Sequence, residues 1–363
     1  PWQLLPIWSE SRSRELDNTI FSPSSNVSIA LRMDRKMLEE YHQALMEILQ
    51  HPKFMLFMRS TTRIQYKDGK RYSSVKKIID NKANVTLLNN VIEDNPRETF
   101  HIEKSGPILV NNDTFASARI LIKRIIKTNS AGLEETVLVH IDEQGKIQSE
   151  INDIPDRLAS ADSIEISFAI KIDEGGVIHP IDATSNNLDS CFYSYLPMNE
   201  QRFKLPLYVN ADFDLHSDRE GVKSDSPWNE FLFYHMGRQL VHAVCNVASA
   251  SQKNYLNLLL ANPFDEANQE TEKLSRAFNR GYEESLLNIP FVINDLGTKV
   301  TTQELIIDKS GITEDVSSEL FYALYNNGKR QPLGSIDASI LSNAIFGIHQ
   351  VDVESVMEAM AEN

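Results

Sequence analysis

The residues whose types and spacing could do chemistry lie mainly between Leu205 and Leu232. Arg219 stands in a polar run just after an alternating apolar stretch, which predicts a loop that follows a strand. An arginine on such a loop can reach a negatively charged ligand, a phosphate for example, held by another part of the molecule. The alternative is a solvated arginine, or one paired with its neighbours Asp218 or Glu220.

The same stretch contains the pattern D-x-D-x-H-x-D, formed by Asp212, Asp214, His216 and Asp218. A period of two places these side chains on one face of a strand, where carboxylates and an imidazole could ligate a divalent metal. Ligands strung along one strand cannot surround an ion unaided. We therefore expect a solvated or hydrogen-bonded outer face in place of a metal site.

A third group lies on the helix predicted after Ser226. His235 and His242 are seven residues apart and share a face, and Cys245 follows closely. These types could form a ligand cluster or a Cys/His pair, but no third ligand is evident. A packing or surface role is the expectation.

The pattern of apolar residues along the chain predicts an α+β fold, whose helices and strands must position these residues. A mixed β-sheet domain is expected over residues 1–225, and a mainly helical region over residues 226–363 with a strand pair near 290–308. In the first region a strand is expected over Thr19–Met33, and a helix follows Asp34 and stops before Pro52. Further strands are expected at RIQYK, NVTLLNNVI, TFHIEK, ILIKRIIK, ETVLVHID, IEISFAIKI, Phe192–Leu196 and Leu205–Leu215, with a hairpin turn at Asp68-Gly69.

In the second region Ser226 is the predicted N-cap and Pro227 the first residue of a long amphipathic helix. A second helix is expected from about Glu266, and the strands PFVIN and ELIID are expected to bracket the turn Asn294 to Gly297. The tail from about Thr313 to Ala361 is expected to be helical.

Composition limits the class of protein. The chain has 363 residues and a net charge of −15, which argues against a broad nucleic-acid surface. Two cysteines without CxxC spacing argue against a disulfide framework and suit a reducing, cytoplasmic setting. No apolar run has the length of a membrane span, and no signal peptide is visible. The phosphate-binding, dinucleotide, serine-hydrolase and zinc-protease motifs are all missing.

The stretch LPLYVNADFDLHSDRE, followed by WNEFL, resembles a signature of sacsin-like ATPases related to the ninety-kilodalton heat-shock chaperone, within the group called GHKL. The matching residues are Leu205, Pro206, Asn210, Ala211, Phe213, Leu215, Ser217, Arg219, Trp228 and Asn229. Further elements of that group are similar to three other stretches of this chain, FYSYLPM, FMLFMR and Ile289–Ile312. The resemblance covers patches between residues 19 and 312, and the family's nucleotide-domain glycine motifs are missing.

The resemblance implies a transducer-type middle domain of βαβ, ribosomal-protein-like architecture and a helical extension, with ATP and Mg bound in an upstream nucleotide-binding domain. The chain begins at Pro1 without an initiator Met, so that domain is expected to precede it. In the family, an arginine matching Arg219 reaches the γ-phosphate across the domain boundary, and Lys204 and Lys223 flank the same region as secondary nucleotide-binding candidates. Asp218 departs from the pattern, and its charge could hold Arg219 away when nucleotide is absent.

Three functions are hypotheses at this point. The first is part of an ATP-dependent chaperone-like or conformational-switch ATPase that is inactive without its nucleotide-binding domain. The second is a non-enzymatic module that binds a protein client or partner through its helical half. The third is a metal-dependent hydrolase. A homodimer is left open, no membrane partner is expected, and the family context includes anti-phage and stress systems.

Overall fold

The structure is a computed structural model, and it describes residues 34–68, 71–80, 83–89, 98–110, 121–142, 144–151, 161–181, 190–217, 221–252, 254–315, 321–323 and 328–362. The chain divides into two compact units, one up to Gln50 and one from His51 onwards. The predicted division at residue 225 remains a prediction. The predicted strand Thr19–Met33 lies outside the described residues.

The first unit contains helix α2 (Arg35–Gln50). Asp34 caps it, because its carboxylate accepts a hydrogen bond from the backbone N–H of Met37 at 2.8 Å. The sequence prediction of a helix that follows Asp34 and ends before Pro52 is confirmed. Leu38 and Tyr41 on its apolar face are more than half exposed.

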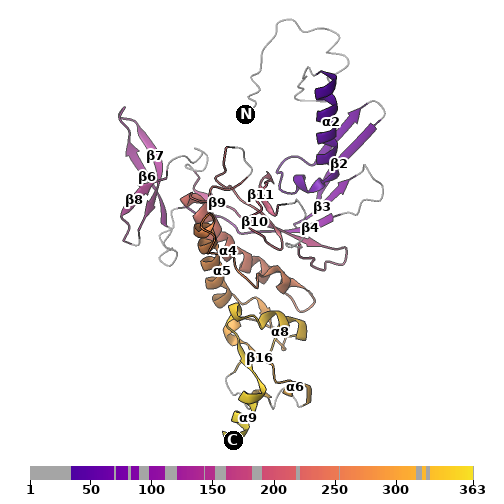
Figure 1. Cartoon of the computed structure of the whole chain (residues 1–363), viewed down its shortest axis with the longest axis vertical. Helices are drawn as coiled ribbons and strands as arrows, with labels where there is room; N and C mark the ends of the chain where they lie inside the picture. Colours follow the sequence, from indigo (N-terminus) through magenta and orange to yellow (C-terminus); the bar gives the residue numbers. More distant parts are fainter. Residues whose placement is uncertain are drawn as a thin grey trace. The chain divides into compact units, whose positions relative to one another are not determined.

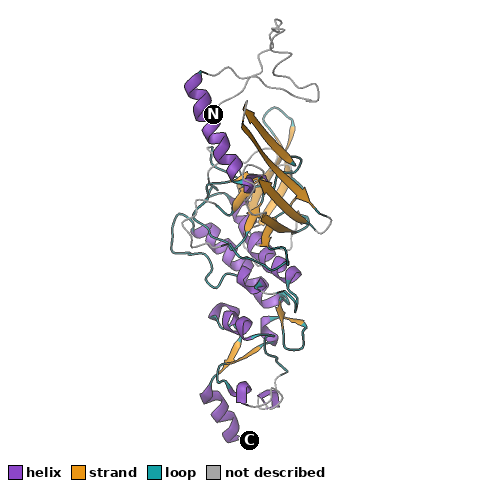
Figure 2. Cartoon of the chain, turned by 90° about the vertical axis from the view of Figure 1, so that its right-hand side faces the viewer, coloured by secondary structure: helices purple, strands orange, loops and turns teal. Residues whose placement is uncertain are grey.

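The second unit is built on an eight-stranded mixed sheet with the order β1-β2-β3-β4-β10-β13-β11-β12 (Figures 1 and 2). All of its pairs are antiparallel except β11 with β13. The chain between β11 and β13 contains no helix, so this parallel pair does not form the expected βαβ unit. Its strands are β1 (Arg63–Asp68), β2 (Arg71–Ile79), β3 (Asn84–Asn89), β4 (Glu98–Lys104), β10 (Ser167–Ile172), β13 (Tyr208–Asn210), β11 (Phe192–Ser194) and β12 (Leu196–Pro197). The predicted hairpin is confirmed, since Asp68 pairs with Arg71.

The sheet curls around the short 3₁₀ turn η1 (Pro52–Met55). This turn contacts β2 and β3 near one end of the strand order and β12 at the other end. Met55, Leu56 and Phe57 are buried there. A separate antiparallel sheet consists of β6 (Leu121–Thr128), β7 (Glu134–Ile141) and β8 (Ile147–Glu150), and β5 (Ile108–Leu109) pairs with β9 (Ser163–Ile164).

Helices α4 (Pro227–Val247) and α5 (Glu272–Asn288) lie side by side and are in close contact (Figure 1). Their backbones approach at two glycines. A Cβ at Gly237 would stand 2.2 Å from the carbonyl oxygen of Phe278, and one at Gly281 would stand 2.1 Å from that of Tyr234. Only glycine fits this crossing.

Aromatic rings join the sheet to the two helices. Phe192 of β11 stacks on Phe233 of α4 with ring centroids 5.9 Å apart, and Phe203 meets Phe233 edge-on at 4.7 Å. Phe264 continues the cluster to Phe278 of α5 at 4.3 Å. Offset and edge-on ring pairs each add stability beyond the area that they bury.

The C-terminal part differs from the sequence prediction. β14 (Val292–Ile293) pairs with β15 (Lys299–Val300), and β16 (Ile306–Asp308) pairs in parallel with β17 (His349–Val351). The predicted pairing of PFVIN with ELIID is therefore wrong, and the predicted helical tail contains a strand. Its other elements are η2 (Tyr255–Leu258), η3 (Thr302–Glu304), α6 (Ile312–Asp315), α8 (Ser335–Leu341), η4 (Ala344–Phe346) and α9 (Val353–Glu362). Helix α5 also begins later than predicted, at Glu272.

The α4–α5 crossing gives a first prediction. Gly237→Ala should destabilise the protein by roughly 1–3 kcal/mol, because a methyl group there must displace the backbone of α5. Alanine would otherwise stabilise a helix interior relative to glycine. Urea unfolding measures the change, and Gln239→Ala on the same helix is the control. A Gly237→Ala protein as stable as the parent would contradict the close crossing.

His235 gives a second prediction. It is 2% exposed on α4, where it packs against Phe231 and Tyr234. Burial, with a smaller contribution from Arg238, lowers its pKa from 6.5 to about 3. Folding therefore keeps His235 neutral. Above pH 6.5 His235 is also neutral in the unfolded chain, so it does not reduce the free energy of unfolding. Below pH 6.5 the unfolded chain binds a proton at His235 that the folded protein does not bind, so the free energy of unfolding falls.

Between about pH 7.5 and pH 5 this single group should cost the folded state about 2 kcal/mol. Unfolding free energies measured at both pH values should show that loss in the parent and not in His235→Gln, which cannot titrate. Equal losses in the two proteins would show that His235 does not titrate differently on folding.

Candidate functional site

The candidate site is the loop between Leu215 and Val222, at the start of the segment that leads into α4. The predicted strand Leu205–Leu215 is much shorter, since only Tyr208–Asn210 is a strand. Beyond it the chain turns back on itself: Leu215 bridges to Val222, and His216 N–H donates to the Gly221 carbonyl at 3.1 Å. We call the part of the loop up to Ser217 its first limb and the part from Gly221 its second limb. The residues between them, Asp218, Arg219 and Glu220, lie outside the described residues.

The first limb of the loop is held by a buried carboxylate. Asp214 is 3% exposed, so at this residue the acidic face is hydrogen-bonded and not solvated. Its Oδ2 accepts a hydrogen bond from the Ser226 hydroxyl at 2.8 Å, and its Oδ1 pairs with the Lys223 ammonium at 3.0 Å. Both partners are needed because an uncompensated buried charge is strongly destabilising.

Helix α4 holds the same limb through its first turn. Ser226 and Pro227 occupy the predicted N-cap and first positions, but the Ser226 side chain serves Asp214 instead of capping the helix. Asn229, fully buried, accepts from Asp214 N–H and donates to the carbonyls of Asp214 and Lys223. Trp228 Nε1 donates to the Asp212 carbonyl at 2.8 Å. The Trp-Asn pair thus ties the helix to the loop.

The second limb is held by an ion pair that the sequence did not indicate. Glu200, 2% exposed, accepts from Val222 N–H at 3.2 Å, and Arg202 donates to the Val222 carbonyl and to the Ser224 hydroxyl, each at 2.8 Å. Arg202 also donates to both Glu200 oxygens, at 2.9 and 2.6 Å. Glu200 and Arg202 therefore hold the second limb through both the backbone of Val222 and the side chain of Ser224. We call these two sets of contacts the polar clasp.

The titration of this ion pair is set by its contacts. Burial alone would raise the pKa of Glu200, but the hydrogen bonds and positive charge of Arg202 outweigh it, and the pKa lies below 4.5. The hydrogen bond and charge of Glu200 in turn raise the pKa of Arg202. The pair is charged at neutral pH.

Tyr195 lies beside the clasp in a backbone conformation that is rare for a residue with a side chain, at φ 64°. Its N–H donates to Asn210 Oδ1 at 2.7 Å, and its hydroxyl donates to Asp212 Oδ2 at 3.1 Å. A left-handed tyrosine costs about 1–3 kcal/mol and persists only where its surroundings fix it.

The two secondary candidates have different surroundings. Lys223 is paired with buried Asp214, so its charge stabilises the loop base. Lys204 donates to the side chain of Gln201 at 2.8 Å. The structure therefore gives each lysine a local partner.

The metal hypothesis concerns Asp212, Asp214, His216 and Asp218. Asp214 is committed to Ser226 and Lys223, and Asp212 accepts from Tyr195. The part of the chain that the structure describes contains no group of three or more His, Cys, Asp or Glu side chains placed to hold a metal ion. On α4, His235 is buried among aromatic rings and the Cys245 thiol donates to the Pro290 carbonyl, which fits the predicted packing role.

Sequence reasoning missed Glu200, Arg202 and Tyr195. The one available signal was the proximity of opposite charges in Glu200-Gln201-Arg202. That spacing is common on exposed loops, so it does not by itself indicate a buried pair.

Comparisons with known proteins give no relative: no family model, no curated protein and no solved structure matches this chain. In the described part of the chain, no helix has both the length and the apolar character needed to cross a membrane.

The clasp gives a third prediction. Glu200→Gln should destabilise the protein by about 2 kcal/mol or more, because the exposed Glu270 is then the one carboxylate among the described residues left to balance the charge of half-buried Arg202. The control is Glu270→Gln, which removes that exposed partner and should change the stability by no more than about 0.5 kcal/mol.

The effect of Glu200→Gln should also depend on pH. A carboxyl group with a lowered folded pKa stabilises fully above its unfolded pKa near 4.5, and it loses that contribution as the pH falls through the folded value. The difference in unfolding free energy between parent and variant should therefore shrink below about pH 4.5. A difference that stays constant through this range would contradict the charged pair.

Proposed function

We propose that this chain is the transducer and C-terminal part of an ATP-dependent, chaperone-like or conformational-switch ATPase. In this proposal the ATP and its Mg ion are bound by a nucleotide-binding domain that precedes the chain. Arg219 contacts the γ-phosphate from the loop between Leu215 and Val222. The sequence resemblance between Leu205 and Asn229 supports it.

The structural observation that carries the proposal is the polar clasp. A loop that only connects a strand to a helix needs no buried carboxylate at each of its two ends. Yet Asp214 on the first limb and Glu200, which binds the second limb from outside the loop, are both almost fully buried. Burying two charges costs desolvation free energy that must be offset by well-placed partners. Their arrangement fixes where the loop leaves and re-enters the fold.

Firm anchoring of the two ends of this loop matters for phosphoryl transfer. Negative charge on the phosphoryl oxygens is stabilised most by a cation that is already in position, because no reorganisation is then needed during the reaction. A guanidinium supplied by a second domain also reports that ATP is bound, which couples hydrolysis to domain closure. Arg219 is the catalytic residue of the proposal. Lys223 holds the loop base, and Lys204 remains a secondary phosphate contact.

The fourth prediction concerns turnover. The chain alone should not hydrolyse ATP, and joined to its nucleotide-binding domain it should do so. In the joined protein, Arg219→Ala should slow turnover by about 100-fold or more and leave the nucleotide dissociation constant nearly unchanged. Steady-state phosphate release and nucleotide titration measure the two quantities.

The control for this experiment is Arg276→Ala on α5, an exposed arginine that pairs with Glu272 and Glu266. It should hydrolyse ATP at the parent rate. If Arg219→Ala also retained the parent rate, the proposed role of Arg219 would be wrong.

The alternative is a non-enzymatic interaction module. Helix α9 gives the observation that favours it, since Val353, Met357 and Met360 form an exposed apolar stripe at helical spacing. On this alternative, partner binding is insensitive to ATP and to Arg219→Ala. Binding that responds to either would exclude it.

A further inference from the structure

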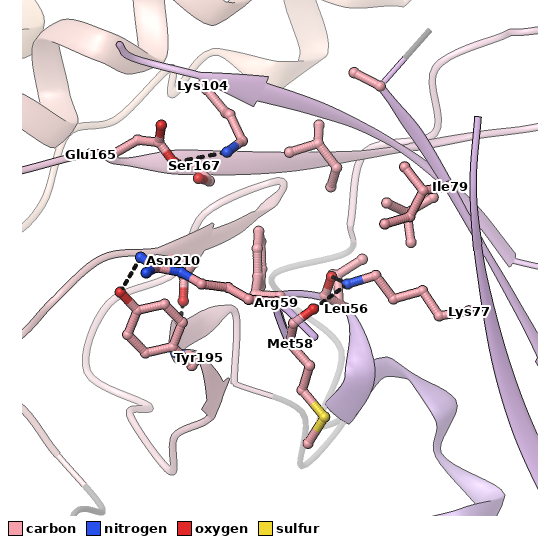
Figure 3. Close-up of a pocket in the computed structure, with 14 residues that line it drawn as sticks. Leu56, Met58, Arg59, Lys77, Ile79, Lys104, Glu165, Ser167, Tyr195 and Asn210 are labelled. Carbon is pink, nitrogen blue, oxygen red and sulfur yellow. Dashed lines mark hydrogen bonds and ion pairs between the residues drawn. The ribbon is translucent and has the colours of Figure 1, made fainter. Parts of the chain in front are cut away.

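A cavity of about 350 Å³ lies inside the curl of the eight-stranded sheet, between the segment 56–59 that follows η1 and strands β2, β3, β4, β10 and β13 (Figure 3). This is the lower end of the size range of small-molecule sites. One part of its wall is apolar and includes Leu56, Val85 and Ile102. The remainder carries Arg59, Lys77, Lys104, Glu165, Ser167, Tyr195 and Asn210.

Lys77 belongs to the frame of the cavity. Its ammonium group donates to the carbonyls of Met55, Leu56 and Met58 at 3.3, 3.0 and 2.6 Å, so its three N–H groups are all used. Burial lowers its pKa. Lys77 thus fixes the segment that carries Arg59, and it offers no donor to a ligand.

Lys104 and Glu165 form an ion pair of 2.9 Å on the opposite side of the cavity (Figure 3). Their side chains are 59% and 44% exposed. Such a pair is worth little in water, so Lys104 can turn to another anion at small cost.

Arg59 is the cation that remains for a ligand. Its guanidinium lies 4.6 Å from the centre of the Tyr195 ring, and its Nη2 donates to the Tyr195 hydroxyl at 2.5 Å (Figure 3). Among the described residues it has no carboxylate partner. A guanidinium has five N–H groups, so stacking on the ring leaves an edge that suits the two oxygens of a carboxylate.

We propose that this cavity binds a small monocarboxylate with an apolar body. The carboxylate pairs with Arg59, Lys104 supplies a second positive charge at the cavity wall, and the apolar body lies against Leu56, Val85 and Ile102. Ser167 and Asn210 supply polar groups at the cavity wall. One negative charge balances the charge of the Arg59 guanidinium. The site requires neither ATP nor Arg219, so it stands or falls independently of the proposed function.

The test is calorimetric titration of the chain with octanoate and with octan-1-ol, which shares the tail and lacks the charge. Octanoate should bind at one site at least tenfold more tightly than the alcohol. Arg59→Gln should weaken octanoate binding at least tenfold and leave the alcohol unchanged. Its control is Arg330→Gln, which removes an arginine that lies at the same 4.6 Å from a tyrosine ring, that of Tyr322, outside the cavity.

A second pair of variants protects the test against misfolding. Ile79 lines the cavity at the end of β2, and its neighbour Ile78 points to the other face of the sheet. Both side chains are exposed, so a carboxylate at either position should leave folding intact. Ile79→Asp should weaken octanoate binding at least tenfold by charge repulsion, and Ile78→Asp should change it less than twofold.

Three results would overturn the proposal. They are absence of octanoate binding to the parent, equal affinity for octanoate and octan-1-ol, and parental octanoate affinity in both Arg59→Gln and Ile79→Asp. The first shows that the cavity takes no such ligand, and the others show that charge does not select it.

Discussion

The buried carboxylate of Asp214 is the constraint on which the rest of this structure depends. A charge that is almost fully removed from water is tolerated only with complete compensation. Its partners come from the returning limb of the loop, Lys223, and from the residue before α4, Ser226. Asn229, in the first turn of the helix, forms hydrogen bonds with both the N–H and the carbonyl of Asp214. One side chain therefore fixes the start of α4 and the return of the loop together.

Packing determines the fold beyond this junction. Once α4 begins at Pro227, its apolar faces must meet the sheet and α5, and Phe233 fills the space between Phe192 and Phe203. The glycines Gly237 and Gly281 then let α5 approach to backbone contact. Close-packed interiors transmit displacement instead of absorbing it. The loop thus stands on a base that is fixed on the helical side as well as on the sheet side.

Part of this could be predicted from the sequence, and the physical reason is locality. The helices after Asp34 and Ser226 and the hairpin at Asp68 depend on residues that are close in sequence, so spacing and capping types were sufficient. The parallel pairing of Ile306–Asp308 with His349–Val351 joins segments far apart in the chain, and no local pattern encodes it. Helix α5 begins at Glu272 and not at the predicted Glu266, because local propensity does not fix the ends of a helix.

The candidate site shows the same limit at the level of side chains. Alternation predicted that Asp212 and Asp214 share a face, but the strand ends at Asn210 and the following backbone is irregular, so period two no longer applies. Burial of Asp214 then depends on α4, which the segment's own sequence does not specify. The pair of Glu200 and Arg202 is also set by tertiary contact, with Val222.

Tyr195 connects the cavity and the loop base, and its hydrogen bonds determine how strongly the two are coupled. The hydroxyl has a single proton, which it donates to Asp212, and it accepts from Arg59. A carboxylate that draws Arg59 towards itself removes a donor to this hydroxyl and leaves the bond to Asp212 in place. The Tyr195 backbone is held separately, by Asn210. Occupation of the cavity should therefore leave the polar clasp intact. The proposed cavity site and the proposed loop site both depend on Tyr195 for contacts, but neither requires the other to be occupied.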